Sequence, residues 1–108
     1  MRTSVAELNQ ALAGFNEVVD LSLSLDNSVE AYGLFIILSD GKGSRIMLKC
    51  AKVSRFNLTN FGGGLTQFLK LRAEDVRAEQ LDRVSIRFVE LERRQVEFYC
   101  DFATVSAA

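Results

Sequence analysis

The stretch that decides the fold runs from residue 17 to residue 38 and reads EVVDLSLSLDNSVEAYGLFIIL. Its first part alternates polar residues with Val19, Leu21, Leu23 and Leu25, and this period of two is typical of a half-buried strand. Residues 26–28 (DNS) have turn chemistry. The second part, residues 31–38, is apolar on both faces, which predicts a central strand covered on one side by a helix. The stretch therefore favours an antiparallel sheet.

Upstream of this stretch, residues 4–13 are expected to form a helix with one apolar face. Apolar residues recur there at spacings of three and four, and Ser4-Val5-Ala6-Glu7 fits a capping box. Gly14 is a natural end for the helix. The sequence thus predicts one amphipathic helix ahead of the sheet.

Downstream, alternation predicts further strands joined by connections short enough for hairpins. One begins near Arg45, is expected to bend or bulge around residues 53–55, and resumes to Leu58. Others are expected over residues 67–73, 84–88 and 95–105, the last with Phe98, Cys100 and Phe102 on one face and Tyr99 and Ala103 on the other. Residues 74–81 are interpreted as a helical turn or ordered loop.

The predicted fold class is α+β, mostly β, with the N-terminal helix (about 4–13) packed on an antiparallel sheet of about seven strands (about 17–105). A chain of 108 residues, 48% apolar and 25% charged, has the size and composition of a single globular domain, here 1–108. Its longest apolar run, Leu34 to Leu38, is far too short to cross a bilayer. No signal-peptide pattern opens the chain, so a cytoplasmic protein without a membrane partner is expected.

The residue types exclude several kinds of catalytic site. The chain has no histidine and two cysteines, which excludes Ser-His-Asp and Cys-His nucleophilic sites and histidine-ligated metals. Cys50 and Cys100 lie in apolar strand patterns and are interpreted as buried thiols. Carboxylates such as Glu74, Glu90 and Glu92 are interpreted as solvated charges in connections. We therefore expect no enzyme, no cofactor and no metal.

Charge is segregated along the chain although the net charge is only −1. Residues 1–40 carry six acidic groups and one basic group, whereas residues 41–72 carry seven basic groups and no acid. This run predicts a positive patch for an anionic partner; the alternative is that acidic neighbouring strands neutralise it. A pI near 5.4 makes nucleic acid an unexpected partner. The candidate partner-binding residues are Arg45, Lys49, Lys52, Arg55 and Tyr99.

The terminal strand also bears on self-association. If it is an edge strand, a symmetric homodimer would bury the outer face that carries Tyr99. The alternative is a monomer whose last strand lies inside the sheet beside the first.

Three segments carry a resemblance to a known group of proteins. They are residues 15–21 (FNEVVDL), the apolar positions Ile46, Leu48, Val53, Phe56 and Leu58, and the alternating Val96, Phe98 and Cys100. The chain resembles small bacterial β-rich proteins, some of which are immunity proteins of polymorphic-toxin systems. This resemblance implies a non-catalytic module that binds and blocks another protein, a toxin, and no site residue is transferred from it.

A second function stays open beside protein binding. The apolar surplus of residues 31–38, together with Phe61 and Tyr99, also suits a small-ligand or lipid-binding β domain. That function requires a concave apolar pocket.

Overall fold

The computed structural model describes residues 4–77 and 85–108. Helix α1 spans Val5–Leu12, with Ser4 as its N-cap and Ala13 as its C-cap. The Ser4 hydroxyl accepts a hydrogen bond from the Glu7 backbone N–H (3.2 Å), and the Glu7 carboxylate accepts one from the Ser4 N–H (3.2 Å). The predicted capping box is therefore confirmed, and the helix buries Leu8 and Leu12.

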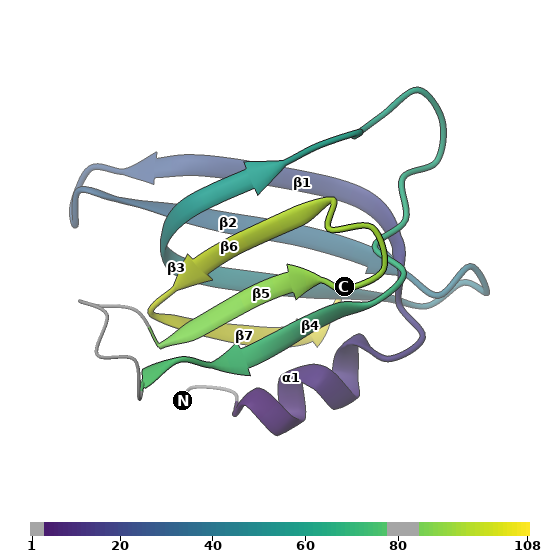
Figure 1. Ribbon diagram of the computed structural model, residues 1–108, viewed down its shortest axis with the longest axis horizontal. Coiled ribbons are helices and arrows are strands. Elements are labelled where there is room, and N and C mark those ends of the chain that lie inside the picture. Colours follow the sequence, from purple (N-terminus) through teal and green to yellow (C-terminus); the bar gives the residue numbers. More distant parts are fainter. Residues whose placement is uncertain (1–3, 78–84) are drawn as a thin grey trace.

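Seven strands follow the helix, as predicted (Figure 1). They are β1 (Glu17–Asp26), β2 (Ala31–Ser39), β3 (Arg45–Leu58), β4 (Leu71–Asp75), β5 (Ile86–Glu90), β6 (Val96–Cys100) and β7 (Phe102–Ala107). All pairs are antiparallel, in the order β1-β2-β3-β6-β5-β4, and β7 pairs with β3. The α+β, mostly β class is confirmed.

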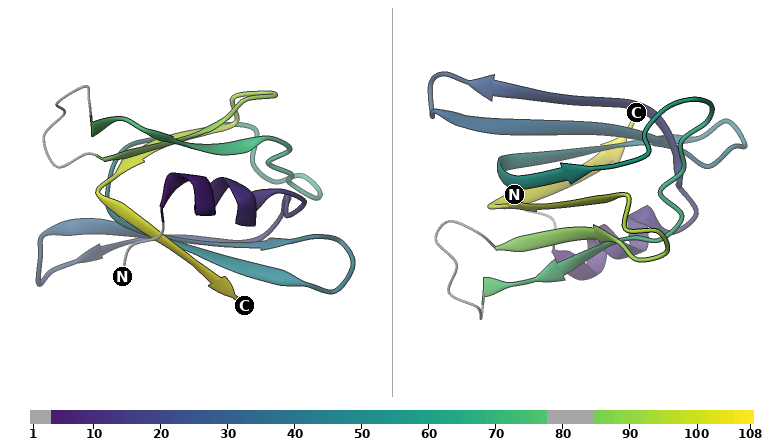
Figure 2. Two further views of the ribbon diagram at one scale, coloured as in Figure 1. Left: turned by 90° about the horizontal axis from the view of Figure 1, so that it is seen from below. Right: turned by 45° about the horizontal axis from the view of Figure 1, so that its top comes forward.

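The long strand β3 belongs to two layers. Residues 45–50 and Val53 pair with β2, residues 46–51 pair with β7, and the end of the strand, from Ser54 to Leu58, pairs with β6. Register shifts separate the two halves, and Lys52 and Arg55 adopt positive φ angles of 56° and 52° there. This is the irregularity that the loss of alternation predicted. Helix α1 lies between the two layers, against β4 and β7 (Figure 2, left).

The predicted terminal strand is divided by a second bend. At Asp101 the chain leaves the second layer as β6 and joins the first as β7. The alternation restarts at the bend, so Ala103 is buried opposite Cys50, and Phe102 is half-buried opposite Ala51 on the other face. The prediction that Phe102 continues the face of Phe98 and Cys100 is wrong for this reason. The last strand also lies beside β3, not beside β1.

The connection after β3 also differs from the prediction. Strands β3 and β4 are separated by β6 and β5, so they form no hairpin. In the predicted strand 67–73, Gln67 makes only an isolated bridge to Glu17, and β4 begins at Leu71. Glu74 and Asp75 belong to β4 instead of a helical turn. The remainder of that predicted turn, from residue 78, and the predicted strand position Val84 lie outside the described residues.

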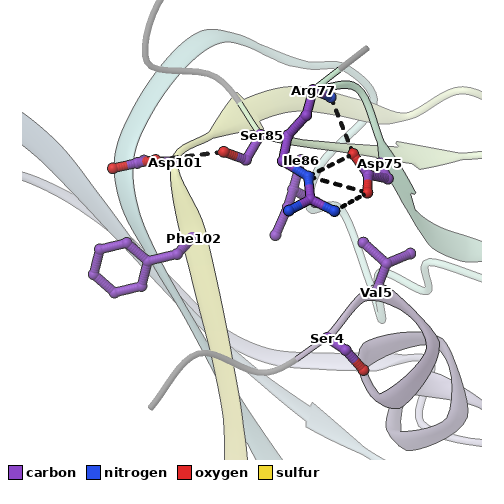
Figure 3. A pocket seen from close by; sticks show the side chains of 8 residues that line it. All are labelled: Ser4, Val5, Asp75, Arg77, Ser85, Ile86, Asp101 and Phe102. Carbon is purple, nitrogen blue, oxygen red and sulfur yellow. Dashed lines mark hydrogen bonds and ion pairs between the residues drawn. The ribbon is translucent and has the colours of Figure 1, made fainter.

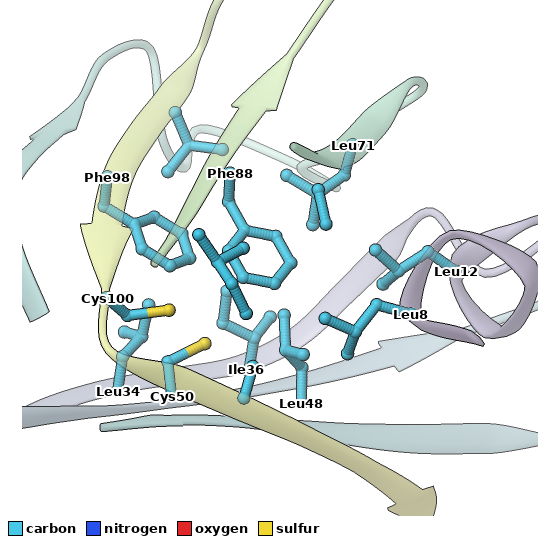
Figure 4. Packing of buried hydrophobic residues seen from close by; sticks show 14 of the residues in the cluster. Leu8, Leu12, Leu34, Ile36, Leu48, Cys50, Leu71, Phe88, Phe98 and Cys100 are labelled. Carbon is cyan, nitrogen blue, oxygen red and sulfur yellow. The ribbon is translucent and has the colours of Figure 1, made fainter. Parts of the chain in front are cut away.

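The hydrophobic core lies between the layers and is closed by the helix (Figure 4). The rings of Phe88 and Phe98 stack with centroids 5.0 Å apart, and Phe56 packs against Phe98 at 5.8 Å. Burial of each such side chain stabilises the fold by roughly 1.5–3 kcal/mol. The core thus joins elements from both ends of the chain: Leu8, Leu12, Leu34, Ile36, Leu48, Cys50, Leu71, Phe88, Phe98 and Cys100.

The hairpin of β1 and β2, which we call the arm, extends beyond the neighbouring strands at its turn (Figures 1 and 2). Near the start of the arm, Val18 and Leu21 pack against the core. Farther out, Leu23 and Leu25 are 40% and 48% exposed, because the core ends before the turn. The prediction of a half-buried strand is therefore wrong for the outer part of β1. No helix among the described residues has the length and apolarity to span a membrane.

Candidate binding surface

A hollow of about 630 Å³ lies between the turn of the arm and the bend of β3. Leu25, Val29, Tyr32 and Phe35 line it from the arm, and Phe102 lines it from β7. Lys49 and Lys52 line it from β3. Asp26 of β1 also lines it. We call it the arm hollow, and it combines an apolar lining with two cations and one carboxylate.

Two of the predicted site residues therefore meet in one place. The Lys49 ammonium lies 5.5 Å from the centroid of the Phe35 ring, a distance at which a cation is attracted to the face of a ring. The Lys52 ammonium lies 4.0 Å from the Asp101 carboxylate. Arg45 and Lys49 lie four residues apart on β3. Both therefore project from the face opposite the buried Leu48.

The other two predicted residues pair with each other on the second layer. The Arg55 guanidinium lies 5.2 Å from the centroid of the Tyr99 ring. Tyr99 is half-buried and stands opposite Ser54 and Arg87 in the sheet. The bend of β3 thus separates Arg55 and Tyr99 from the face of Arg45 and Lys49. Within the described ranges, Lys52 is the only one of the four basic candidates with a carboxylate within 4.0 Å.

A smaller hollow of about 340 Å³ lies beside the start of the helix (Figure 3). Its Arg77 guanidinium is held by Asp75, with a shortest distance of 2.6 Å. These hydrogen bonds lower the pKa of Asp75 and raise that of Arg77. Ser85 donates a hydrogen bond of 3.5 Å to Asp101, which lacks the imidazole that activates a serine nucleophile in a triad.

The outer face of the second layer carries a charge cluster that involves no pocket. Arg87 contacts Glu74 and Glu97 on the strands at either side, each at 2.6 Å. Burial opposes the charged form of Arg87, but hydrogen bonds to Glu97 and Glu74 outweigh it and raise its pKa. The two carboxylates thus converge on a guanidinium, an arrangement that stabilises the sheet.

The interpretation of Glu90 as a solvated charge is wrong. Its side chain is fully buried. It accepts hydrogen bonds from the backbone N–H groups of Lys70 (3.0 Å), Glu92 (3.0 Å) and Arg93. Burial raises the pKa of Glu90, but the backbone hydrogen bonds outweigh it and the pKa lies below its ordinary value. Glu90 therefore holds two connections together, and no local sequence signal distinguishes it from Glu92.

The two cysteines are buried side by side in the core (Figure 4). A hydrogen bond with Cys100, together with burial, raises the pKa of Cys50 well above its ordinary value. In the described part of the chain, no group of three or more histidine, cysteine or acidic side chains could hold a metal ion.

We expect both thiols to be unreactive in the folded protein, because both are buried and a reagent must reach the sulfur to react with it. A disulfide-exchange reagent at pH 7 should label neither cysteine of native protein within the time in which it labels both in denaturant. Rapid labelling of one thiol in native protein would contradict this arrangement.

Comparison with protein-family models, with curated proteins and with solved structures found no match.

Proposed function

We propose that this chain is a non-catalytic module that binds another protein through the arm. The observation that carries the proposal is the exposure of large apolar side chains within one hairpin. Leu23, Leu25, Val29 and Tyr32 are 40%, 48%, 53% and 48% exposed. Contiguous apolar surface on a folded protein marks interaction sites, and aromatic side chains are enriched in them. Lys49 and Lys52, which line the hollow together with Leu25, Val29 and Tyr32, favour a partner that carries acidic groups near the hollow.

Photo-crosslinking from the arm tests this proposal. With Tyr32 replaced by benzoylphenylalanine in the cells that make the protein, we expect one discrete protein adduct after irradiation. The matched control places the same residue at Arg72, which is exposed on β4 at the other end of the strand order. Adducts of equal yield at both positions, or none at Tyr32, would contradict protein binding through the arm.

The resemblance to immunity proteins makes a bacterial toxin the first partner to test. On this proposal, the chain forms a stable complex with a toxin encoded beside it and blocks that toxin without turnover. Calorimetry with the purified pair measures the complex directly. A neighbouring toxin that shows no heat of binding would remove the toxin version and leave protein binding intact.

The arm hollow also favours a second candidate, a small anionic amphiphile. Its volume of about 630 Å³ lies within the usual range of ligand pockets, and its lysines could bind an acidic head group while the aromatic rings contact an apolar tail. Native mass spectrometry of protein purified from cells distinguishes the two functions. A mass above that of the chain, lost in a Lys49→Glu variant, would favour the ligand over the protein.

A further inference from the structure

Strand β1 has an edge that the rest of the described chain leaves open. At its start, the Val18 N–H donates to the Thr66 carbonyl, and the Phe68 N–H donates to the Asn16 carbonyl. From Asp20 to Asp26 the strand pairs with β2 alone, in continuous register. Outside that ladder, the described chain makes one backbone hydrogen bond to this stretch. The Val29 N–H donates to the Asp26 carbonyl within the turn. We call the stretch Asp20–Asp26 the open edge.

The edge at the opposite end of the strand order, that of β4, is covered by the helix. The side chain of Asn9 donates to the Ala73 carbonyl of β4 (2.9 Å) and accepts from the Ala73 N–H (2.7 Å). Helix α1 also packs against β4 and β7. Unpaired edges invite pairing with another chain unless they are covered, charged or bulged. The helix thus covers the edge of β4. The edge of β1 has no such cover in the described structure, and its one bulge lies between Val18 and Asp20.

The side chains of the open edge form a symmetric pattern. Leu21, Leu23 and Leu25 share one face, Ser22 and Ser24 share the other, and an aspartate stands at each end on the serine face. From residue 17 to residue 41 the chain has no lysine or arginine. The described structure places no cation within 4.0 Å of either aspartate.

From this pattern we infer that the open edge binds an extended basic segment of the partner protein by strand addition. The segment has apolar residues opposite Leu21, Leu23 and Leu25, and a lysine or arginine opposite each of Asp20 and Asp26. Main-chain hydrogen bonds supply affinity in strand addition, and alternate side chains supply specificity. The two cations lie six residues apart and flank three alternating apolar residues, so the motif fits in either direction. This inference rests on the proposed function and names the chemistry of its partner.

Charge argues against a second copy of the chain as the occupant. Antiparallel self-pairing that sets Leu23 opposite Leu23 would also set Asp20 opposite Asp26 at both ends. Like charges directly opposite each other destabilise a strand pair. A shifted register still gathers the acidic groups of both arms, Glu17, Asp20, Asp26 and Glu30 in each, with no basic residue in either arm. A basic segment removes this repulsion.

Fluorescence anisotropy with labelled heptapeptides tests the inference on the full chain. The probe is capped Lys-Val-Thr-Val-Thr-Val-Lys, and its counterpart has glutamate at both ends. We expect the basic peptide to bind and the acidic peptide to bind more weakly. Asp20→Lys is a variant at an exposed position. With the basic peptide it turns one opposite-charge pair into a like-charge pair, so the affinity for that peptide should fall roughly fivefold. The affinity for the acidic peptide should rise by a similar factor.

Glu92→Lys is the control, because it changes the net charge by the same amount away from the arm. It should change neither affinity by more than about twofold.

Backbone methylation separates strand addition from binding in the arm hollow. Methylating the peptide nitrogens of either the valines or the threonines blocks one of the two hydrogen-bonding edges. One of these peptides should lose binding and the other should keep it. Equal binding of both would overturn strand addition.

The remaining outcomes distinguish this inference from the proposed function. If no heptapeptide binds at 1 mM while the Tyr32 adduct forms, strand addition is overturned and protein binding through the arm stands. If neither peptide binding nor the adduct is seen, both fail. A concentration-dependent dimer in sedimentation equilibrium that Leu23→Lys abolishes would show that a second copy occupies the edge, which also overturns the inference.

Discussion

Replacing Glu90 by glutamine is expected to lower the free energy of unfolding by about 3 kcal/mol, because hydrogen bonds to a buried charged group are each worth about 1.5–3 kcal/mol. One carboxylate oxygen accepts from the N–H groups of Lys70 and Glu92, and the other accepts from Arg93. An amide of the same shape sets its NH₂ group against N–H donors on one side. Urea unfolding of both proteins at pH 7 measures the difference.

Glu92→Gln is the matched control for this substitution. Glu92 is exposed, and among the described residues its carboxylate makes one ionic contact, at 3.7 Å from the Lys70 ammonium. Exposed pairs of this kind contribute about 0–1 kcal/mol, so its loss should be several times smaller. Equal losses in the two variants would mean that the buried hydrogen bonds add nothing beyond an exposed charge.

The effect of Glu90 should also depend on pH in a definite direction. Because the pKa of Glu90 in the folded protein lies below its ordinary value of 4.5, its contribution is fully present above about pH 5 and is lost as pH falls through the folded pKa. Glutamine does not titrate, so the difference between wild type and Glu90→Gln should shrink below pH 4.5. A difference that stays constant down to pH 3 would contradict the ionised state of this carboxylate.

Local alternation predicted most of the strands correctly. The serine–leucine pattern of β1 and the alternation of Arg45 with Ile46 through Cys50 depend only on neighbouring residues, and the structure has a strand at each. The capping box at Ser4 is local in the same way. Features that depend only on residues close together in the sequence can therefore be predicted from it.

The bends explain most of the differences between the predicted and observed strands. A period of two reports the face of a side chain only relative to its own strand. When the chain turns at Asp101 it changes both layer and partner, so Phe102 and Ala103 exchange the faces predicted for them. The change of face results from long-range strand pairing. The residue types around Asp101 do not predict it.

The candidate site was predicted in part for the same reason. Charge counting found a basic run, and the structure brings its Lys49 and Lys52 to one hollow. It could not show that the bend of β3 directs Arg55 to Tyr99 on the other layer. Nor could it show that Leu23 and Leu25 extend past the end of the core, because exposure depends on where the second layer stops.

Asn9 shows how a helix residue can protect a sheet edge, and Asn9→Ala is expected to lower the free energy of unfolding by about 2 kcal/mol. Asn9 lies among the polar residues of the helical pattern, yet it is half-buried and its amide bonds both backbone groups of Ala73. Without it, the Ala73 N–H and carbonyl lose their partner while Ala73 itself is buried. Gln10→Ala is the control, because Gln10 is exposed on the same helix and alanine favours helix formation; its stability should be unchanged or slightly raised.

Asn9→Asp separates the two hydrogen bonds. Aspartate keeps an acceptor for the Ala73 N–H but sets a second carboxylate oxygen against the Ala73 carbonyl, so it should lose about as much stability as alanine, roughly 2 kcal/mol. Because β4 is then less well covered, both Asn9 variants should also associate at high concentration, where the wild type and Gln10→Ala show no such increase. Thermal unfolding followed by circular dichroism measures the stability, and light scattering of the same samples measures association. Asn9 variants that unfold and scatter light as Gln10→Ala does would show that the packing of Leu8 and Leu12 alone holds the helix on the edge of β4.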